Sequence, residues 1–570
     1  MLQKTRKLIW DYIKKSSWRV KENANMTFSH SGMVGFVANY CISDFVLAEV
    51  LPPEAAEAHT EGYIHIHDLS GGTQDYCMGI ALDSLLYKGL EDGEVPRHFL
   101  SAMGIMMNAL YTISQEVAGA VAFNAVDALM APYIKKDKLS YDWVKQIIQT
   151  IIYSINVKGR IGFQAPFCNF QLDITVPKRL KDQTVVIDGE VMPFTYGDCQ
   201  AEMDMFNKAL LEVMMEARRV LSFPVINIGV TRDFDWDSPL AETIFRAVGS
   251  MGQPTINNYV SGEYDPDSVK SMCCSLRLDM TKLFKQAGGQ FGSGDNTGSI
   301  GVVTINMPML AAEAAGDKAK LFDLIDHYMD IADIALTEKR GFIEMMMKNG
   351  MFPYLKRFVD DFSNFFSTIG VIGLNEMCLN MGLPDISHDE SVLFVEEVMD
   401  HMNSRLVHYQ EMRKTFYGSY RGVVYNLELV PGEGATYRLA KHMKKKYPNA
   451  HTANGTGGMY LTRGCWLPAD KQFSLRFSAQ HQSRLQKLFS GGANWQWHFG
   501  QVIHDWRAVR DIIYKLVNET ELPFISLSPV IAVCPICGKL QDDRQWCEHE
   551  LTPEQIAELR QRGIEIDETR

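Results

Sequence analysis

SMCCSLRLDMTKLFKQAGGQFGSGDNTGSIG, residues 271–301, joins two adjacent cysteines to a glycine-rich segment and then to an apolar run. Cys273 and Cys274 precede a polar stretch that we expect to be helix-like, and five glycines follow between residues 288 and 298. Glycine at this density lets the backbone turn tightly or approach another element closely. Residues 299–307 (SIGVVTINM) carry few charges and no alternation. This pattern predicts a strand covered on both faces, as in a parallel sheet.

Long helical patterns surround this expected strand. Apolar residues recur every three or four positions over residues 199–220, 103–133 and 321–348, which predicts helices that bury one side. Short β-branched runs such as residues 185–187 lie between them. Strands separated by long helices favour an α/β architecture. The chain becomes polar and cysteine-bearing after residues 526–533, so we expect a main unit over residues 1–525 and a small module over 526–570.

Composition limits the classes of function. The net charge of −13 argues against a general nucleic-acid-binding surface, although a local basic pocket for phosphates remains possible. The sequence begins without a signal-peptide pattern and shows no run of about 18 apolar residues. We therefore expect a cytoplasmic protein without a membrane span.

Eleven cysteines in 570 residues do not indicate a disulfide scaffold, so a reducing compartment with a few reactive thiols is expected. We interpret Cys41, Cys168, Cys199 and Cys378 as small core side chains. Spacing alone leaves two readings of Cys273-Cys274 open. They lie either on a loop delivered into the middle of a barrel, shielded from water as radical chemistry needs, or on a glycine-rich surface loop.

Seven ordered motifs decide between these readings. They are Glu22-Asn23-Ala24-Asn25, YIHIHDL (63–69), RIGFQ (160–164), SMCCSLRL (271–278), TGSIGVVTINM (297–307), FSTIGVIG (366–373) and PGEGATYRLA (431–440). With the terminal cysteines, they make the sequence resemble the anaerobic (class III) ribonucleotide reductases over nearly its whole length. These belong to the glycyl-radical enzymes and reduce ribonucleoside triphosphates to 2′-deoxyribonucleoside triphosphates.

The resemblance implies a ten-stranded α/β barrel with a central finger loop. The family's thiyl radical maps to the Cys273-Cys274 pair, with Cys273 favoured, and it abstracts the 3′ hydrogen of the ribose. Cys77, in QDYCMG (74–79), matches a second cysteine that assists loss of the 2′ hydroxyl as water. Family members often carry an alanine-asparagine pair where this chain has Ser293-Gly294, so Asn296 is the nearest amide for the ribose hydroxyls.

Two further motifs are candidates for substrate binding. Gly432, Gly434, Ala435 and Thr436 open an expected helix, where exposed N–H groups and the helix dipole favour an anion. A Gly-x-Gly turn alone is often only a turn, but this one matches the family's triphosphate-binding loop. His65 and His67 alternate as on one face of a strand. No third ligand is evident nearby, so we prefer a structural or substrate-side polar role for the two histidines over a metal pair.

The terminal module has the pattern of a zinc site. Cys534 and Cys537 form a Cys-x-x-Cys pair that can bind one tetrahedral ion, and Cys547 follows at a suitable distance. The family usually supplies a fourth cysteine, whereas this chain has His549, which could complete a Cys3His site. A redox-active Cys-x-x-Cys is the alternative, but no βαβ context surrounds it.

The resemblance also implies cofactors and partners. A radical S-adenosylmethionine iron–sulfur activase generates the family's glycyl radical, and nucleoside triphosphates act as allosteric effectors. A homodimer is expected, with formate or a small redox protein as reductant. The family's Arg-x-x-Gly-Tyr-like radical block is not found in these residues, so a glycyl loop beyond or apart from them is expected. The early position of residues 22–25 leaves no room for the N-terminal ATP-sensing domain of many relatives.

Two rival functions remain at this stage. One is another glycyl-radical enzyme of the lyase type, acting on a small acid. The other is a nucleotide-binding homologue without catalysis, which the retained Cys77 and Cys273 argue against. Formation of deoxynucleotides would separate the first hypothesis from both rivals.

Overall fold

The computed structural model describes most of the chain. The described residues are 2–15, 28–91, 94–217, 221–261, 269–272, 276–279, 296–413, 423–430, 432–455, 458–529, 532–533 and 540–541, with residues 553 and 557.

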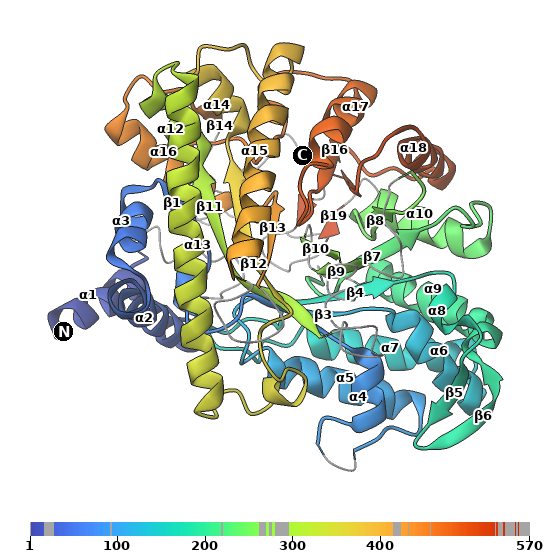
Figure 1. Cartoon of the computed structure of the whole chain (residues 1–570). Coiled ribbons are helices and arrows are strands. Elements are labelled where there is room, and N and C mark those ends of the chain that lie inside the picture. Colours follow the sequence, from blue (N-terminus) through green and yellow to red (C-terminus); the bar gives the residue numbers. More distant parts are fainter. Residues whose placement is uncertain are drawn as a thin grey trace.

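One large sheet organises the molecule (Figure 1). Its strands follow the order β13-β12-β11-β2-β3-β4-β7-β8-β17-β16, and β1 pairs with β11 outside this path. Neighbouring strands are mostly parallel, whereas β2 with β11 and β8 with β17 are antiparallel. The fold is therefore a mixed α/β fold with a large, mostly parallel sheet, as expected. The strands are β1 Ile64–Ile66, β2 Cys77–Ile80, β3 Val121–Phe123, β4 Cys168–Leu172, β7 Val225–Val230, β8 Thr255–Asn258, β11 Thr297–Asn306, β12 Phe365–Ile372, β13 Val424–Glu428, β16 Trp495–Phe499 and β17 Phe524–Pro529.

The two ends of this strand order approach each other. Glu428, at the end of β13, forms an isolated parallel bridge with Gly492. The Leu429 N–H donates to the Gly492 carbonyl at 3.0 Å, and the Gly491 N–H donates to the Leu427 carbonyl at 2.7 Å. The edge strand β13 therefore contacts the segment that leads into β16.

Helices pack around the sheet. Helix α13 lies against β11 and β12, while α9 packs on α6, α7 and α10 (Figure 1). The helices are α1 Leu2–Ile13, α2 His30–Phe45, α3 Pro53–Glu61, α4 Leu82–Lys88, α5 Phe99–Ile113, α6 Val126–Asp137, α7 Tyr141–Ile155, α8 Lys178–Lys181, α9 Gln200–Glu216, α10 Pro239–Met251, α12 Met307–Ala314, α13 Lys318–Lys348, α14 Leu374–Asn380, α15 Asp389–Arg413, α16 Glu433–Lys446, α17 Leu475–Gln486 and α18 Trp506–Glu519.

Within the described residues, four antiparallel strand pairs stand apart from the large sheet. They are β5 Thr184–Ile187 with β6 Glu190–Thr195, β9 Val269–Met272 with β10 Leu276–Asp279, β14 Ala453–Gly455 with β15 Gly458–Tyr460, and β18 Ala532–Val533 with β19 Leu540–Gln541.

Several sequence expectations are confirmed at this level. Helix α9 (200–216) forms most of the stretch 199–220, α13 covers 321–348, and all ten residues of β11 are buried. Others were wrong. Residues 103–133 form two helices with β3 between them, and residues 276–279 form a strand where a helix-like stretch was expected. Strand β17 belongs to the large sheet and runs from Phe524 to Pro529, and the division of the chain near residue 525 stays a prediction.

Among the described helices, the segment His30–Val50 is long and apolar enough to cross a membrane by length and composition alone. The sequence analysis did not single out this segment. Helices of soluble proteins meet the same criterion, so the segment is weak evidence for a membrane span.

Candidate functional site

Cys77 is the first residue of β2 and lies opposite Ser299 of β11. Its side chain is 3% exposed and belongs to a small buried cluster separate from the main core. The Ala120 N–H donates to Cys77 Sγ at 3.4 Å, which fixes the thiol on this face of the sheet. The other cluster members are Ala120, Ala122, Phe366 and Val424.

Two glycines let the backbone come close to Cys77. A Cβ atom at Gly119 would lie 2.4 Å from the Tyr76 carbonyl oxygen and 2.9 Å from Cys77 Sγ. A Cβ atom at Gly298 would lie 2.0 Å from the Cys77 carbonyl oxygen. Neither distance is possible for a real side chain, so both positions need glycine. Gly298 is the last of the five glycines between residues 288 and 298, and it allows β11 to approach β2 closely.

Arg160 supports the loop that holds the thiol. Its guanidinium donates to the carbonyls of Val117 and Ala118, each at 2.6 Å, and to that of Gly119 at 3.3 Å. Burial lowers the pKa of Arg160, and the charges of Asp68 and Cys77 oppose that shift. The RIGFQ motif therefore contributes a cation beside Cys77, a role that the sequence analysis did not assign.

Asn296 lies at the other end of β2. Its Oδ1 accepts a hydrogen bond from the Ala81 N–H at 2.9 Å. This contact joins the start of β11 to the residue after β2. The contact that we find for Asn296 is therefore with the backbone, and its expected role at the ribose stays a prediction.

Cys273 and Cys274 lie outside the described residues. The strands on either side of them, β9 and β10, pair antiparallel with Met272 opposite Leu276. Strand β9 also lies close to β2 and β3, so the chain that leads to Cys273 runs beside the strand that begins at Cys77.

The other expected core cysteines differ among themselves. Cys168, Cys199 and Cys378 are buried, which confirms the interpretation for these three. Cys41 is exposed, so the expectation for this residue was wrong. It lies on α2, a helix that buries little of its surface.

His65 and His67 lie together on one side of β1. Their ring centroids are 4.6 Å apart, and His67 Nε2 makes a 2.8 Å hydrogen bond with Thr304 Oγ1. The ring of His59 follows at 5.6 Å from that of His65. Burial, assisted by the nearby Arg438, lowers the pKa of His67 to about 4 and that of His59 to about 3. These rings are thus neutral at pH 7 and can offer hydrogen bonds but no positive charge.

The N-terminus of α16 meets this histidine cluster. Gly432 caps the helix, and a Cβ atom there would lie 3.1 Å from His67 Cε1. A Cβ atom at Gly434 would have no atom within 4 Å. Arg438, one turn later, lies with Nη1 3.3 Å from His65 Nδ1. The structure therefore brings together the glycine loop and the histidine pair, which are far apart in sequence.

Ala435 and Thr436 complete this first turn. Ala435 is buried, and the Thr436 N–H donates to the Gly432 carbonyl at 3.0 Å. A helix N-terminus that opens with small residues suits an anion. The guanidinium of Arg438 adds positive charge on the same side of the cluster.

The expected zinc ligands Cys534, Cys537, Cys547 and His549 lie outside the described residues. Strands β18 and β19 pair antiparallel, with Val533 opposite Leu540, on either side of the Cys-x-x-Cys segment. Among the described parts of the chain, no group of three His, Cys, Asp or Glu side chains could hold a metal ion.

Sequence reasoning missed a row of buried amides on β4, β7 and β8. Gln171 lies beside Asn227 in the ladder, and Asn257 Nδ2 donates to Gln171 Oε1 at 2.9 Å. Asn227 and Asn257 are fully buried. The signal was present as alternation of amides with apolar residues in CNFQL, VINIGV and TINN. One face of this half of the sheet is therefore polar although it is shielded from solvent.

The fold is shared with solved ribonucleotide reductases. The anaerobic ribonucleotide reductase from Thermotoga maritima, in complex with dATP and CTP, matches with a TM-score of 0.69 at 19% sequence identity. The match covers 90% of this chain and 85% of that chain. The protein therefore has the α/β fold of this class of enzyme.

Sequence comparison then gives the family. Residues 22–556 match the family described as anaerobic ribonucleoside-triphosphate reductase, and the chain belongs to this family. The Escherichia coli K12 enzyme of that name is 20% identical over 561 residues, covering 89% of this chain and 73% of the relative. The enterobacteria phage T4 enzyme is 22% identical over 466 residues, covering 73% and 71%.

The protein is accordingly an oxidoreductase that reduces ribonucleoside triphosphates to deoxyribonucleoside triphosphates under anaerobic conditions. This assignment favours nucleotide reduction over the lyase alternative.

Proposed function

We propose that Cys77 and Cys273 are the two thiols by which this reductase acts, on opposite faces of the ribose. Cys273, as a thiyl radical, takes the 3′ hydrogen atom, and Cys77 assists loss of the 2′ hydroxyl as water. The buried Cys77 thiol, held beside the strands that lead to Cys273, is the observation that carries this proposal. An S–H group suits both tasks because it can give either a hydrogen atom or a proton.

The roles of Cys273 and Cys274 are tested by replacing one cysteine at a time. Cys273→Ala should abolish deoxynucleotide formation by the anaerobically activated enzyme while nucleotide binding is kept. Cys274→Ala is the matched control and should retain turnover. Substrate deuterated at C3′ should react more slowly with the wild-type enzyme. Turnover by Cys273→Ala together with an inactive Cys274→Ala would move the radical to Cys274.

The N-terminus of α16 is proposed to bind the substrate triphosphate. The small residues Gly432, Gly434, Ala435 and Thr436 leave backbone N–H groups accessible, and Arg438 lies one turn away. His65 and His67, both neutral, would orient the phosphates by hydrogen bonds.

Gly434→Ala tests this proposal sharply, because an added methyl group meets no protein atom within 4 Å. The variant should therefore fold normally. If a phosphate lies against this turn, the methyl group takes its space and KM for the triphosphate should rise about tenfold, a loss of roughly 1.4 kcal/mol. An unchanged KM would leave the loop as a simple turn.

Zinc is proposed for the terminal module. Cys534 and Cys537 fall in the sequence between the paired strands β18 and β19, and thiolates with an imidazole are a donor set that Zn²⁺ prefers. Cys547 and His549 would complete the site. The ion would cross-link the segment over residues 526–570 and contribute directly to its folding.

The remaining elements of the proposal concern assembly and partners. Contacts between β13 and the segment before β16 support a ten-stranded barrel closed around the site. A glycyl radical made by a radical S-adenosylmethionine activase would supply the unpaired electron, and formate or a small redox protein the reducing equivalents. Allosteric nucleotides are proposed because the Thermotoga maritima enzyme has been solved with dATP bound in its specificity site. A homodimer is proposed from the family resemblance alone.

A further inference from the structure

The guanidinium group of Arg438 is turned toward the segment that carries the histidine cluster. Arg438 lies in the second turn of α16, but its nitrogen atoms contact residues 59–65. Nη2 donates to the His59 carbonyl, and Nη1 lies 3.5 Å from the Ile64 carbonyl oxygen and 3.3 Å from His65 Nδ1. The side chain therefore fastens α16 to the segment that leads into β1.

The contact between Arg438 and His65 has only one possible direction. A guanidinium group carries N–H donors and no acceptor, and it stays protonated in proteins. His65 Nδ1 is therefore the acceptor, and it carries no proton. Burial, together with the rings of His67 and His59 and the charge of Arg438, lowers the pKa of His65 well below its ordinary value. A neutral imidazole has a single N–H, so the proton of His65 is on Nε2 at pH 7.

His59 has the same tautomer for a different reason. The Ile66 N–H donates to His59 Nδ1 at 3.1 Å, so this nitrogen carries no proton either. Burial lowers the pKa of His59 to about 3, and its single proton is on Nε2 as well. The backbone of β1 sets the tautomer of His59, whereas the side chain of Arg438 sets that of His65. His59 is therefore an internal reference for His65, whose ring centroid lies 5.6 Å away.

The protonated nitrogen of His65 makes no hydrogen bond within the part of the chain that the structure describes. The His65 ring meets the His67 ring edge-on, with 4.6 Å between their centroids. His67 Cε1 in turn would lie 3.1 Å from a Cβ atom at Gly432. His65 is thus separated from the N-terminus of α16 by a single ring. An unused N–H donor beside a helix N-terminus suits a phosphate oxygen, which accepts hydrogen bonds.

We propose that Arg438 is a positioning residue that holds the proton of His65 on Nε2, so that His65 donates a hydrogen bond to the substrate triphosphate at the N-terminus of α16. This inference rests on the proposed triphosphate site and adds that Arg438 acts through His65 rather than on the phosphate itself. With the proton on Nδ1, the ring would turn the lone pair of Nε2 toward the phosphate and repel it. The guanidinium group excludes that tautomer.

Nitrogen NMR of the full chain measures the tautomer without substrate, radical or activase. In protein made with isotope-labelled histidine, protonated and bare ring nitrogens give separate signals, and magic-angle spinning records them in a large protein. The signals lost in His65→Gln and in His59→Gln identify the two rings. We expect both rings to carry the proton on Nε2 in the wild-type protein. A bare Nε2 in His65 would overturn the inference, whether or not any Arg438 variant folds.

Arg438→Met removes the donor and leaves the carbonyls of His59 and Ile64 as nearby acceptors. A second population of His65, with the proton on Nδ1, should then appear, because that proton can bond to one of these carbonyls. The signals of His59 should not change, since a backbone N–H sets its tautomer. Arg438→Lys keeps a donor and should restore much of the single tautomer. If the His65 signals are the same in the wild-type protein and in Arg438→Met, the inference is wrong.

Kinetics of the anaerobically activated enzyme test the link to the triphosphate. His65→Gln keeps an amide donor near the position of Nε2, whereas His65→Asn places its amide near Nδ1 and loses that donor. We expect KM for the ribonucleoside triphosphate to rise about tenfold in His65→Asn and severalfold in Arg438→Met, with little change in kcat. In His65→Gln the rise should be smaller. His408→Asn, at an exposed position of α15, is the control and should keep the wild-type KM.

Combining two substitutions shows whether Arg438 acts through His65. Arg438→Met together with His65→Asn should have a KM close to that of His65→Asn alone, because no imidazole remains to be oriented. Effects that multiply would mean that Arg438 binds the phosphate itself, which contradicts the inference. Failure of the proposed triphosphate site looks different. In that case Gly434→Ala and His65→Asn would both leave KM unchanged although the tautomer of His65 is as expected, and the role of His65 at the phosphate would be wrong with it.

Discussion

Two glycines, Gly119 and Gly298, lie so close to Cys77 that no other residue type fits at either position. Gly119 and Gly298 bring two main-chain segments to distances that exclude any Cβ atom. The close approach of Gly119 and the hydrogen bond from the Ala120 N–H restrict the position of the sulfur. Such fixed placement is what a hydrogen-transfer group requires, since misplacement by about 1 Å can cost a hundredfold in rate.

Gly119→Ala should disturb this placement. The new methyl group would overlap the Tyr76 carbonyl oxygen and Cys77 Sγ, so strand and thiol must shift. We expect a loss of stability of about 1–3 kcal/mol and a larger loss of kcat than of nucleotide affinity. Chemical unfolding and steady-state kinetics give the two quantities. Gly104→Ala, on α5, adds a methyl group with no neighbour within 4 Å and should be neutral or slightly stabilising.

The sequence predicted the reactive cysteines only through their motifs. Cys77 has no spacing signal of its own, and resemblance to a family identified it. The charged residues near it were not predicted, because Arg160 and Lys339 belong to segments that are far from Cys77 in the sequence. Periodicity shows which face of a helix is buried, but it does not show which distant charged groups lie near that face.

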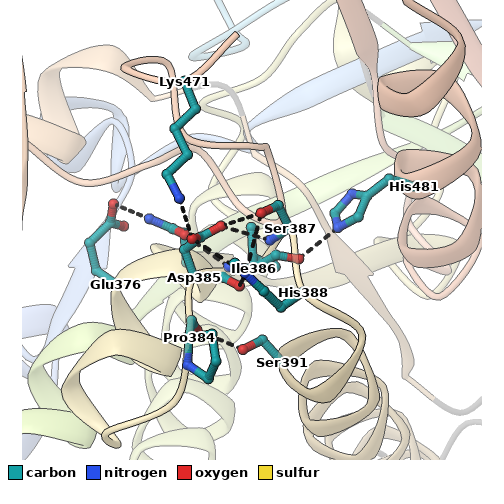
Figure 2. Close-up of polar contacts among 10 residues, drawn as sticks. Glu376, Pro384, Asp385, Ile386, Ser387, His388, Ser391, Lys471 and His481 are labelled. Atoms are coloured by element: carbon teal, nitrogen blue, oxygen red, sulfur yellow. Dashed lines mark hydrogen bonds and ion pairs between the residues drawn. The ribbon is translucent and has the colours of Figure 1, made fainter. Parts of the chain in front are cut away.

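Among the elements, the turn between α14 and α15 is fixed by a compact polar network (Figure 2). Lys471 Nζ lies 2.6 Å from Asp385 Oδ2, and the Ser387 N–H donates to Asp385 Oδ1 at 3.0 Å. His481 of α17 hydrogen-bonds the Ile386 carbonyl at 2.7 Å. The network therefore ties α17 to the turn that leads into α15.

Asp385→Asn should destabilise the protein in a pH-dependent way. The hydrogen bonds from Lys471 and Ser387 outweigh desolvation and lower the pKa of Asp385 to about 2. The folded state thus favours the ionised form. The stabilisation is complete above the ordinary carboxyl pKa of about 4 and is lost as pH falls through about 2.

We expect a loss of about 1 kcal/mol at pH 7, reduced by screening at the half-exposed Lys471. Urea unfolding of both proteins across acid pH measures the difference. A difference that stays constant down to the acid limit would contradict the account. Activity at neutral pH should be unchanged, which distinguishes this network from the site.

Secondary structure was predicted correctly where a helical pattern continued over many turns. It was predicted wrongly where pairing with distant strands determined the structure. The stripes of α9 and α13 span many turns, so helix was the correct reading. Residues 121–123 are apolar and lie between two helices, so the sequence alone suggested continuous helix. They form β3 because β2 and β4 pair with them on either side, a tertiary contact that no local pattern contains.

At the scale of the whole molecule, the terminal module should carry metal. Purified protein should contain about one zinc per chain by elemental analysis, because Cys534, Cys537 and Cys547 provide at least three ligands. Cys534→Ser should lose the ion and loosen the terminus while the large sheet stays folded. Cys41→Ser, at an exposed cysteine, should keep the full zinc content. Metal-free protein with an ordered terminus would contradict the assignment.

The alternation of strands and helices in the sequence predicted an α/β architecture, and the structure confirms it. The order of the strands could not be predicted from the sequence. Strand β11 lies between β2 and β12, although more than two hundred residues separate it from β2. That order places Cys77 opposite Ser299, near the start of β11, and the pairing of β1 with β11 brings the histidine cluster beside α16. The site therefore depends on long-range pairing, which motifs could indicate only by resemblance.

The most direct test of the account compares two buried cysteines. Cys77→Ala and Cys168→Ala each remove one buried thiol from a strand of the same sheet, but Cys168 belongs to the main core. After anaerobic activation, Cys77→Ala should lower deoxynucleotide formation by about a thousandfold or more while binding nucleotide normally, whereas Cys168→Ala should remain active. Deoxynucleotide formation by Cys77→Ala at a rate near that of the wild-type enzyme would contradict the account.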